Sequence, residues 1–454
     1  MELVYNIKDK PPFPKALATA FQQVLAILAG TIAVPMVVGN GMSQSAALFG
    51  AGVGTIIYLI FTKFRSPVFL GSSFSYVGSM LAAFAGAASM AISGYVGLIL
   101  GALLCGILYS ILSLIIHFAG TDWISKVMPP VIIGPTVTII GLTLSPNAIN
   151  NLLQGGVLNL EGVSVANPYI CLACGLVCLL TAVIVSTYAK GLLKLIPFLI
   201  GIGAGYLVAL LFTGISYWTD NEMFRVINFD IFKTITWVPD FAFIHAFEDL
   251  GKFESVGQFF SYFGVIAVAY VPVAFVTFAE HIADHKNLSF ITGSNLLENP
   301  GLSRTLLGDG IGSFAGAFCG GCPNTTYGES ISCVALSKIA STFVIFLSSI
   351  IAIIASFVGP LMSFFESIPP CIVGGLCIAL YGFIAASGFQ MLKNVDMSDT
   401  KNIFIVASIL VVGVGGLAIQ VYEFQFSPVA TAMTVGILIN AIISIKPKKH
   451  KLDK

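Results

Sequence analysis

Charged residues are scarce in this chain of 454 amino acids. Asp, Glu, Lys and Arg make up 9% of it, whereas soluble domains carry about 25%. Hydrophobic residues make up 57%, and the mean hydropathy is +0.96. A water-soluble protein of this size could not cover its surface with so few charges. The composition therefore excludes a soluble globular protein and predicts one embedded in a lipid bilayer.

The sequence also lacks the common motifs of catalysis and of ATP use. It has no P-loop, no Rossmann glycine pattern, no nucleophile elbow and no metal-ligand spacing. We therefore expect no enzyme activity, no cofactor, no metal and no nucleic-acid partner. Without an ATP-binding domain, an ion gradient is the expected source of energy for any transport.

The nine cysteines lie almost all within apolar segments, and we expect free thiols. Cys171-x-x-Cys174 has the spacing of a redox motif, but its neighbours are apolar. We interpret the pair as small packing residues on a membrane helix.

Apolar windows of about 17–25 residues identify membrane spans. We predict an all-α polytopic membrane protein with fourteen of them. The first begins after Lys15 and lacks a small-residue cleavage site, so we expect no cleavable signal peptide. The windows lie near 16–38, 44–62, 72–90, 93–117, 127–146, 168–188, 192–213, 261–281, 305–320, 324–337, 339–360, 367–387, 402–420 and 427–445.

The basic residues test this topology. With alternating spans and the amino terminus in the cytoplasm, only Arg225, Lys233 and Lys252 of the 21 Lys and Arg residues fall outside. Cytoplasmic loops are normally the ones enriched in Lys and Arg. The pattern predicts a protein of the inner (plasma) membrane with both termini in the cytoplasm.

Two related segments indicate an internal duplication. Residues 128–134 and 368–374 each contain a Pro-Pro pair, three apolar residues and a Gly, and they enter the membrane from opposite sides. Inverted repeats of this kind build many secondary transporters. We predict a first seven-span repeat over 1–213, an extracellular loop over 214–258, a second, inverted repeat over 259–446 and a cytoplasmic tail over 447–454.

The third and tenth spans are short and correspond to each other in the two repeats. Each has a Pro followed by Ser or Thr residues and an aromatic residue, over 66–74 and 322–329. Backbone inside a membrane must satisfy its own hydrogen bonds unless it lines a cavity. We expect an extended stretch and then a short helix in each, and paired broken segments point to the substrate site.

Acidic residues inside the spans are few, and burying them is costly. Glu280 lies near the end of the eighth predicted span, and Asp284 follows on the same helical face. Glu329 lies in the broken tenth span. These carboxylates can accept N–H groups of a planar heterocycle or carry a proton. Alternatively Asp284 faces water at the membrane edge, and Asp309 has either a structural or a substrate role.

Three aromatic residues accompany these acids. Phe74 in the third span could stack on a ring, and Tyr327 and Tyr381 could form walls of a pocket. For Phe74 taken alone, ordinary packing in the bilayer is the alternative.

At these residues the sequence resembles the nucleobase–ascorbate transporter family (nucleobase–cation symporter 2), and within it the bacterial uracil and uracil-xanthine permeases. The resemblance covers nearly the whole chain. Its most specific blocks are Ala279-Glu280-His281 and Pro323 to Glu329, with weaker ones at 11–12, 21–26, 70–74, 299–302 and 380–382.

The resemblance implies a core domain of spans 1–4 and 8–11, a gate domain of spans 5–7 and 12–14, and a homodimer. Glu280 would bind the N–H groups of the base, and Glu329 would coordinate it from span 10. We expect Glu280, Asp284 and Glu329 to take part in proton coupling. Main-chain groups at Phe74, Gly328 and Glu329 would complete the contact, and Phe74 and Tyr381 would flank the ring. The implied function is proton-coupled nucleobase uptake by alternating access.

The sequence departs from the family pattern at several positions. Asp284 stands where uracil permeases often have His, Gln23 where span 1 usually has His, and Ser330-Ile331-Ser332 replaces the usual Asn-containing signature. Glu329 at the head of that signature favours uracil. A xanthine or purine permease is the alternative, and a sulfate or bicarbonate carrier of related fold is a further one. A channel is another alternative, but a channel would not need paired broken spans that contain a titratable acid.

Overall fold

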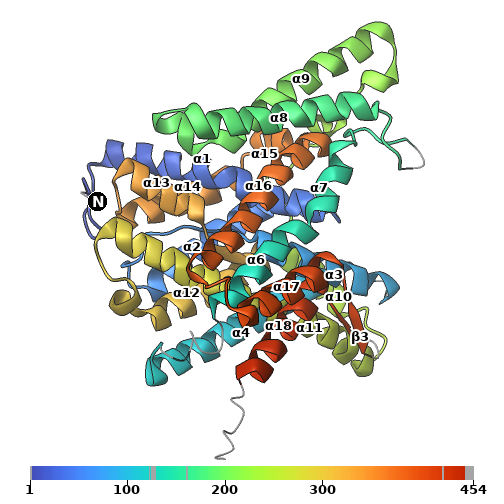
Figure 1. The fold of residues 1–454 in the computed structure, drawn as a ribbon. Coiled ribbons are helices and arrows are strands. Elements are labelled where there is room, and N and C mark those ends of the chain that lie inside the picture. Colours follow the sequence, from blue (N-terminus) through green and yellow to red (C-terminus); the bar gives the residue numbers. More distant parts are fainter. Residues whose placement is uncertain are drawn as a thin grey trace, which may run out of the picture.

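The structure is a computed structural model that describes residues 3–90, 92–121, 123, 129–159, 162–421 and 424–444, and it is built almost entirely of helices (Figure 1). The first half contains α1 (Phe13–Val38), α2 (Gln44–Phe61), β1 (Leu70–Ser72), the 3-10 turn η1 (Phe74–Tyr76), α3 (Val77–Ala87), α4 (Tyr95–Ala119), α6 (Pro130–Thr143), α7 (Ser145–Leu152), α8 (Pro168–Tyr188) and α9 (Pro197–Thr219).

The second half is also mainly helical and has more interruptions. It contains α10 (Ala242–Leu250), α11 (Val256–Thr292), α12 (Leu302–Gly320), β2 (Asn324–Thr326), α13 (Gly328–Ser337), α14 (Thr342–Ser356), α15 (Gly359–Glu366), α16 (Pro370–Met391), α17 (Thr400–Val414), β3 (Ile419–Val421), β4 (Phe424–Phe426) and α18 (Pro428–Ser444).

Local sequence explains where many of these helices begin. Proline is the first residue of α6, α8, α9, α16 and α18, where the missing N–H has no intrahelical partner to lose. The side chains of Ser43, Asn167, Ser255 and Asp399 cap α2, α8, α11 and α17 by accepting a backbone N–H.

Each of the fourteen predicted spans coincides with at least one helix. Within the described residues, eight helices are long and apolar enough to cross a membrane, or nine if α14 and α15 count as one span. The helices of spans 3, 10, 13 and 14 are shorter than this criterion requires. Fourteen complete crossings therefore stay a prediction.

The helices form two groups. In the first group, α2 packs against α12 and α14, α4 packs against α11 and α12, and α1 packs against α14. In the second group, α16 packs against α6, α7 and α8, and α17 packs against α6 and α18. Helices α8 and α9 lie together along one edge of the molecule (Figure 1). The two groups contain the predicted core and gate spans, respectively, although relative movement between them stays a prediction.

Glycine allows close helix contacts in each group. A Cβ atom on Gly54 of α2 would lie 2.6 Å from the Gly312 carbonyl oxygen of α12. A Cβ atom on Gly375 of α16 would likewise overlap the Gly175 carbonyl oxygen of α8. Small residues that bring backbones together are typical of helix packing in membranes, where apolar burial between helices gives little driving force.

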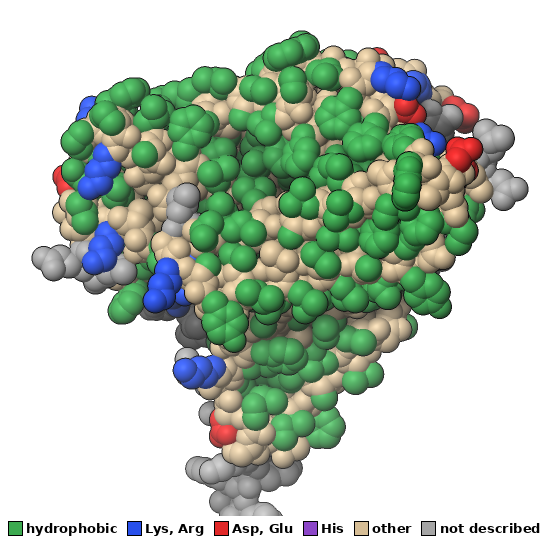
Figure 2. All heavy atoms as spheres, turned by 90° about the horizontal axis from the view of Figure 1, so that it is seen from above, with side chains coloured by type: hydrophobic (Ala, Val, Ile, Leu, Met, Phe, Trp, Pro, Cys, Tyr) green, Lys and Arg blue, Asp and Glu red, His purple; other side chains and the backbone are tan. Residues whose placement is uncertain are grey.

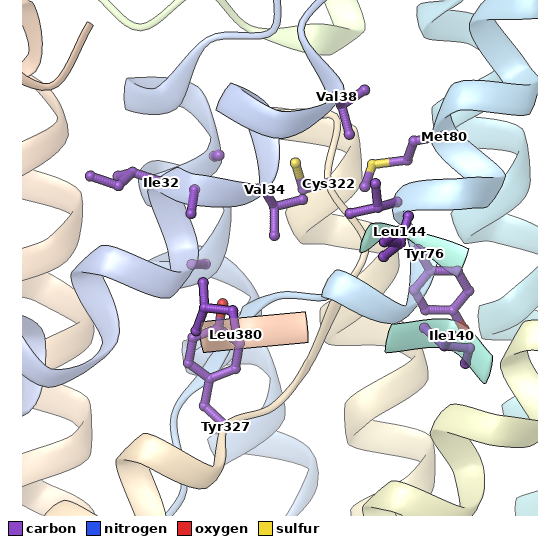
Figure 3. Packing of buried hydrophobic residues seen from close by; sticks show 14 of the residues in the cluster. Ile32, Val34, Val38, Tyr76, Met80, Ile140, Leu144, Cys322, Tyr327 and Leu380 are labelled. Carbon is purple, nitrogen blue, oxygen red and sulfur yellow. The ribbon is translucent and has the colours of Figure 1, made fainter. Parts of the chain in front are cut away.

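The surface agrees with a bilayer environment. Figure 2 shows a face on which hydrophobic side chains are spread over the middle and Lys and Arg lie nearer the edges. The exposed large hydrophobic residues of the molecule include Leu207, Leu211 and Trp218 of α9. Apolar residues from distant parts of the chain also meet inside the molecule: Figure 3 shows Tyr76 of η1 and Met80 of α3 in one buried cluster with Ile140 of α6 and with Leu144, the residue after α6.

The two broken segments pair with each other. Strands β1 and β2 are antiparallel, with Leu70 opposite Thr326 and Ser72 opposite Asn324. The expectation of an extended stretch followed by a short helix is confirmed for both segments, because α13 begins two residues after β2 and α3 follows β1 after the turn η1.

Several boundaries differ from the prediction. Helix α11 continues to Thr292, so Glu280 lies well inside the helix and not near the end of a span. Hydropathy drops after Phe278, but the polar side chains that follow bond inside the bundle and the helix continues. The chain also bends by 79° between α14 and α15, and α17 ends at Val414, before the hairpin β3–β4. The loop between α9 and α11 contains the helix α10.

Two sequence predictions concern residues outside the described part of the chain, namely Met128 of the repeated motif and the tail over 447–454. The nine cysteines are all within the described part and all are free, as expected. Cys171 and Cys174 are buried in α8, which agrees with a packing role.

Candidate functional site

The candidate site surrounds the β1–β2 pair, where the two half-length helices begin. Helix α3 starts after the turn η1, and α13 starts immediately after Tyr327. The amino-terminal ends of both helices therefore lie at the paired strands. A helix amino terminus carries a partial positive charge and free N–H groups, which suits acceptor atoms of a bound molecule.

Helix α11 places two acids against this pair of strands. The Ser75 hydroxyl donates to the Glu280 carboxylate, with Oγ 3.2 Å and 3.3 Å from the two oxygens. One turn further on, Thr326 Oγ1 donates to Asp284 Oδ2 over 2.6 Å. Both acids are half-buried. The site thus joins residues 75 and 326, from the two broken segments, through two acids on one face of α11.

Glu329 lies in the first turn of α13 and is half-buried. Its neighbour Gly328 is exposed, and a Cβ atom placed there would contact nothing within 4 Å. The backbone at this turn is therefore accessible to a bound molecule. A carboxylate in the first turn of a helix is also stabilised by the helix dipole, by about 0.3–1 kcal/mol.

Hydrogen bonds fix the first turn of α13 to α1 and to the residue before β1. Ser330 Oγ accepts the Phe69 N–H over 2.9 Å and also bonds Gln23 Nε2 of α1. The same Nε2 donates to the Ser330 carbonyl oxygen over 3.2 Å. Gln23 thus holds the first turn of α13 against α1, and Ser330 holds it against Phe69, the residue before β1.

Phe74 and Tyr381 lie opposite each other across the two helix groups. Their ring centroids are 6.2 Å apart, with the planes at 78°. Phe74 is half-buried, whereas Tyr381 is buried and its hydroxyl has no hydrogen-bond partner in the described part of the protein. The two aromatic residues predicted to flank a ring are therefore brought together.

Tyr327 occupies a different position from the one its place in the sequence suggests. It is buried, and its hydroxyl donates to the Ser72 carbonyl oxygen over 2.6 Å. Its ring lies close to the backbones of Gly30 and Gly71, where Cβ atoms would fall 3.2 Å and 2.6 Å from ring atoms. Figure 3 shows this side chain among residues of the buried cluster, which includes Leu380. The Tyr327 side chain, which follows β2, therefore packs against both β1 and α1.

Behind the site lies a buried polar network that the sequence did not suggest. His281 Nδ1 donates to Asp309 Oδ2 over 2.8 Å, and His281 Nε2 lies 3.0 Å from Thr305 Oγ1. This gives Asp309 a bond that joins α11 to α12, in agreement with the structural alternative. The sequence signal that could have revealed this network is the spacing of His281 and His285, which lie four residues apart on α11.

The second histidine continues this network towards α2. His285 Nδ1 donates to the His281 carbonyl oxygen over 2.8 Å, so Nε2 is free to accept from the Tyr58 hydroxyl, 2.7 Å away. Both histidines are buried. Among the described residues, no group of three or more His, Cys, Asp and Glu side chains is arranged to hold a metal ion.

A comparison with known families decides the kind of protein. A model described as the permease family matches residues 14–422. The chain belongs to this permease family. Membership confirms the resemblance found in the sequence motifs and makes the protein a multi-pass membrane transporter.

Curated relatives of this permease match along its whole length. The uracil permease of Bacillus subtilis is 35% identical over 99% of this chain and 97% of its own. The uracil permease of Escherichia coli K12 is 30% identical over 99% and 96%. The putative pyrimidine permease RutG of Escherichia coli K12 is 27% identical over 96% and 91%.

Solved structures share the fold of this permease at low sequence identity. The transmembrane domain of the cyanobacterial bicarbonate transporter BicA superposes with a TM-score of 0.62 at 14% identity, covering 96% of this chain and 100% of that one. The murine anion transporter Slc26a9 in its inward-facing state gives 0.64 at 12%, covering 96% and 69%. These likenesses show the fold alone.

Proposed function

We propose that this permease takes up a nucleobase, with uracil as its preferred substrate, in symport with protons. The observation that carries the proposal is the placement of three acids, Glu280, Asp284 and Glu329, around the paired starts of α3 and α13. Relatives named uracil permease, at 30–35% identity over nearly the whole chain, support the same substrate.

The chemistry of the site suits a neutral, flat molecule that carries N–H donors and carbonyl acceptors. The Glu280 and Glu329 carboxylates would accept the N–H groups of the base. Backbone N–H groups at the start of η1 and α13, at Phe74, Gly328 and Glu329, would donate to its carbonyl oxygens. Phe74 and Tyr381 would flank the ring, and Tyr327 would position α13 without contacting the substrate.

The acids also suit proton coupling. An ionised carboxylate within a membrane protein is expensive unless it is well solvated or bonded. Ser75 and Thr326 each offer a hydroxyl to one acid, and among the ion pairs of the described residues none involves Glu280, Asp284 or Glu329. Because no cation holds these charges in place, each acid can take up a proton or release it as the site opens to either side.

Alternating access would be a movement of the first helix group against the second. Two cavities lie between the groups, one at each end of α16. One, of about 430 Å³, is lined by Val37, Gln44 and Glu366 among others. The other, of about 710 Å³, is lined by Ala279, Ala283 and Gln390 among others. These are the places where entry from either side of the membrane would open.

We also propose that both termini lie in the cytoplasm of a cell whose plasma membrane holds the permease. Lys8, Lys10, Lys63 and Arg65 gather around one cavity at one end of the bundle. Arg225, Lys233 and Lys252 belong to the loop between α9 and α11. The excess of basic residues at one end supports that end as cytoplasmic.

Anion transport is a second candidate, because the solved proteins of the same fold are bicarbonate and anion transporters. The acids of this chain argue against it, since three carboxylates at the helix starts would repel an anion unless all were protonated. Uptake of sulfate or bicarbonate by liposomes containing the purified permease would support the anion reading.

The deciding experiment is uptake of radiolabelled uracil in cells that lack their own uracil permease, with and without a protonophore. We expect uptake that the protonophore abolishes and that excess xanthine, guanine or ascorbate leaves unchanged. Inhibition by xanthine, or no uptake of uracil, would move the substrate to purines.

Two variants test the site itself. Glu329→Gln keeps size and polarity but removes the charge, and we expect uracil uptake to fall to background. Glu280→Ala removes the N–H acceptor, and we expect the binding of uracil to purified protein to be lost. Glu248→Gln, in the loop between α9 and α11, is a matched control that should keep both activities. Unchanged uptake or retained affinity in the two site variants would contradict the assignment.

A further inference from the structure

A further cavity of this permease, whose lining includes none of the three site acids, is formed by basic and aromatic side chains. It has a volume of about 430 Å³, and its walls include Lys8, Lys10, Lys63, Arg65, Phe343 and Phe346. We call it the basic cavity. It contains four cationic groups and no acidic side chain in its lining. Four like charges around one space repel one another unless an anion occupies it.

Three separate segments of the first helix group build this cavity, and backbone hydrogen bonds fix them together. The amino-terminal segment runs beside the start of α14, where Ala340 N–H donates to the Tyr5 carbonyl oxygen and Thr342 N–H donates to that of Ile7. The Thr342 hydroxyl lies 3.2 Å from the Phe64 carbonyl oxygen, which adds the turn after α2. The cavity is therefore a formed site rather than a chance gap between mobile lysines.

The turn that carries two of its residues has an unusual backbone. Lys63 and Phe64 have φ angles of +53° and +51°, in the left-handed region that L-residues other than Gly, Asn and Asp seldom adopt. Two consecutive residues of this kind are costly, and such strain is typical of sites where side-chain placement matters. Here the conformation brings both side chains into the wall of the basic cavity.

The four cations have no competing internal counter-ions. Among the ion pairs of the described residues, none involves Lys8, Lys10, Lys63 or Arg65. Lys10 Nζ lies 5.9 Å from the centre of the Phe343 ring, and Arg65 donates to the amide oxygen of Asn299 over 2.6 Å. Both contacts leave the positive charge uncompensated.

Nearby acids are separated from the cavity or already bonded. The Asp9 carboxylate accepts the Asn6 N–H over 2.7 Å. Glu298 lines a neighbouring cavity that shares Lys8 and Arg65 with the basic cavity, and it is absent from the lining of the basic cavity itself. The lining of the basic cavity itself therefore has four positive charges and no negative one.

We propose that the basic cavity binds a phosphate-bearing anion and thereby fastens the amino-terminal segment to α2 and α14. Phosphate oxygens match the mixed lysine and arginine lining, and the Phe343 and Phe346 rings form an apolar floor for the rest of the ligand. The same phosphate chemistry could come from an anionic phospholipid headgroup or from a small soluble phosphate. Basic pockets beside membrane helices are suited to the headgroup.

The test uses the full-length permease, purified in detergent and stripped of lipid. Thermal unfolding is followed while dioleoyl-phosphatidylglycerol, dioleoyl-phosphatidylcholine or inorganic pyrophosphate is added. The double variant Lys8→Gln/Lys10→Gln removes two charges of the cavity from an exposed segment. The matched control is Lys190→Gln/Lys194→Gln, which removes two exposed charges between α8 and α9, outside the cavity.

We expect phosphatidylglycerol to raise the unfolding temperature of the unmodified chain and of the control, and phosphatidylcholine to have little effect. Because the double variant lacks two charges of the cavity, the concentration of phosphatidylglycerol that gives half of the full stabilisation should be about 30-fold higher for it. Stabilisation by phosphatidylglycerol alone supports a lipid headgroup, whereas equal stabilisation by pyrophosphate supports a soluble phosphate.

Three results would overturn the proposal. They are equal effects of phosphatidylcholine and phosphatidylglycerol, an unchanged response of the double variant, or an equal loss of response in the control. If the double variant does not fold, the single variant Lys10→Gln takes its place, and removal of one charge should raise the concentration of phosphatidylglycerol for half-maximal stabilisation about 5-fold. None of these readouts involves uracil transport, so the proposed function stands or fails separately.

Discussion

Replacing Gly71 with Ala tests how the site depends on the contact between the two broken segments. A Cβ atom on Gly71 would lie 2.6 Å from two ring atoms of Tyr327, closer than real contacts of this kind allow. The ring cannot easily move away. Its hydroxyl is bonded to the Ser72 carbonyl oxygen, and its other neighbour is Gly30, whose own Cβ position is only 3.1 Å from the hydroxyl.

The size of the effect follows from this confinement. Adding a methyl group to a closely packed interior typically costs about 1–3 kcal/mol. Tyr327 precedes α13 directly, so a shift of its ring would move the first turn that carries Glu329. If about 2 kcal/mol is needed to restore the binding geometry, the affinity for uracil falls about 30-fold.

The measurements are thermal unfolding of the purified permease and the binding of uracil to it. Gly203→Ala is the matched control, because its Cβ atom would contact nothing within 4 Å and it lies within the helix α9. We expect the control to bind uracil normally and the Gly71→Ala variant to lose both stability and affinity. Adding Tyr327→Leu, a smaller side chain, should restore part of the stability. A Gly71→Ala variant as stable and as tight-binding as the unmodified chain would refute the reasoning.

Two further predictions concern the hydrogen bonds of two acids, Asp284 and Asp249. Thr326→Val removes the donor to Asp284, and we expect a loss of about 1.5–3 kcal/mol in unfolding free energy. Thr326→Ser should keep the bond, and chemical denaturation compares the two. The Asp249 carboxylate of α10 accepts the Ser93 N–H over 2.6 Å and the Ser93 hydroxyl over 2.7 Å, just before α4 begins. Asp249→Asn removes the negative charge and so weakens these two hydrogen bonds. We expect a similar loss in thermal unfolding, and an unchanged midpoint would show that α10 does not anchor α4.

The broken segments illustrate what the sequence can and cannot predict. Pro67 and Pro323, with the Ser, Thr and Gly residues after them, indicated extended stretches before short helices, and both are present. The pairing of the two stretches was not predicted. Each strand has only three residues, and a strand of that length gives no alternating pattern from which a partner or a register could be inferred.

Side-chain roles were harder to predict than backbone form. Tyr327 was expected to line a pocket because it stands two residues before Glu329, yet its ring packs between Gly30 and Gly71. Sequence proximity cannot show which way a side chain leaves a strand. The extension of α11 to Thr292 was missed for a related reason. A hydropathy window ends a span at the first polar run, although His281 and His285 are bonded within the bundle.

Asp309, which lies beside α11, differs from Glu280 and Asp284 on α11 in its burial and in its hydrogen-bond partner. Asp309 is paired with His281, and both side chains are wholly buried, so neither can exchange a partner without breaking the contact between α11 and α12. Glu280 and Asp284 are half-buried and receive only hydroxyl donors. A neutral hydroxyl satisfies one lone pair and leaves the rest of the carboxylate free for a proton or for a ligand N–H. Helix α11 thus carries a fixed polar anchor, His281, and two acids that stay free for the proton exchange proposed above.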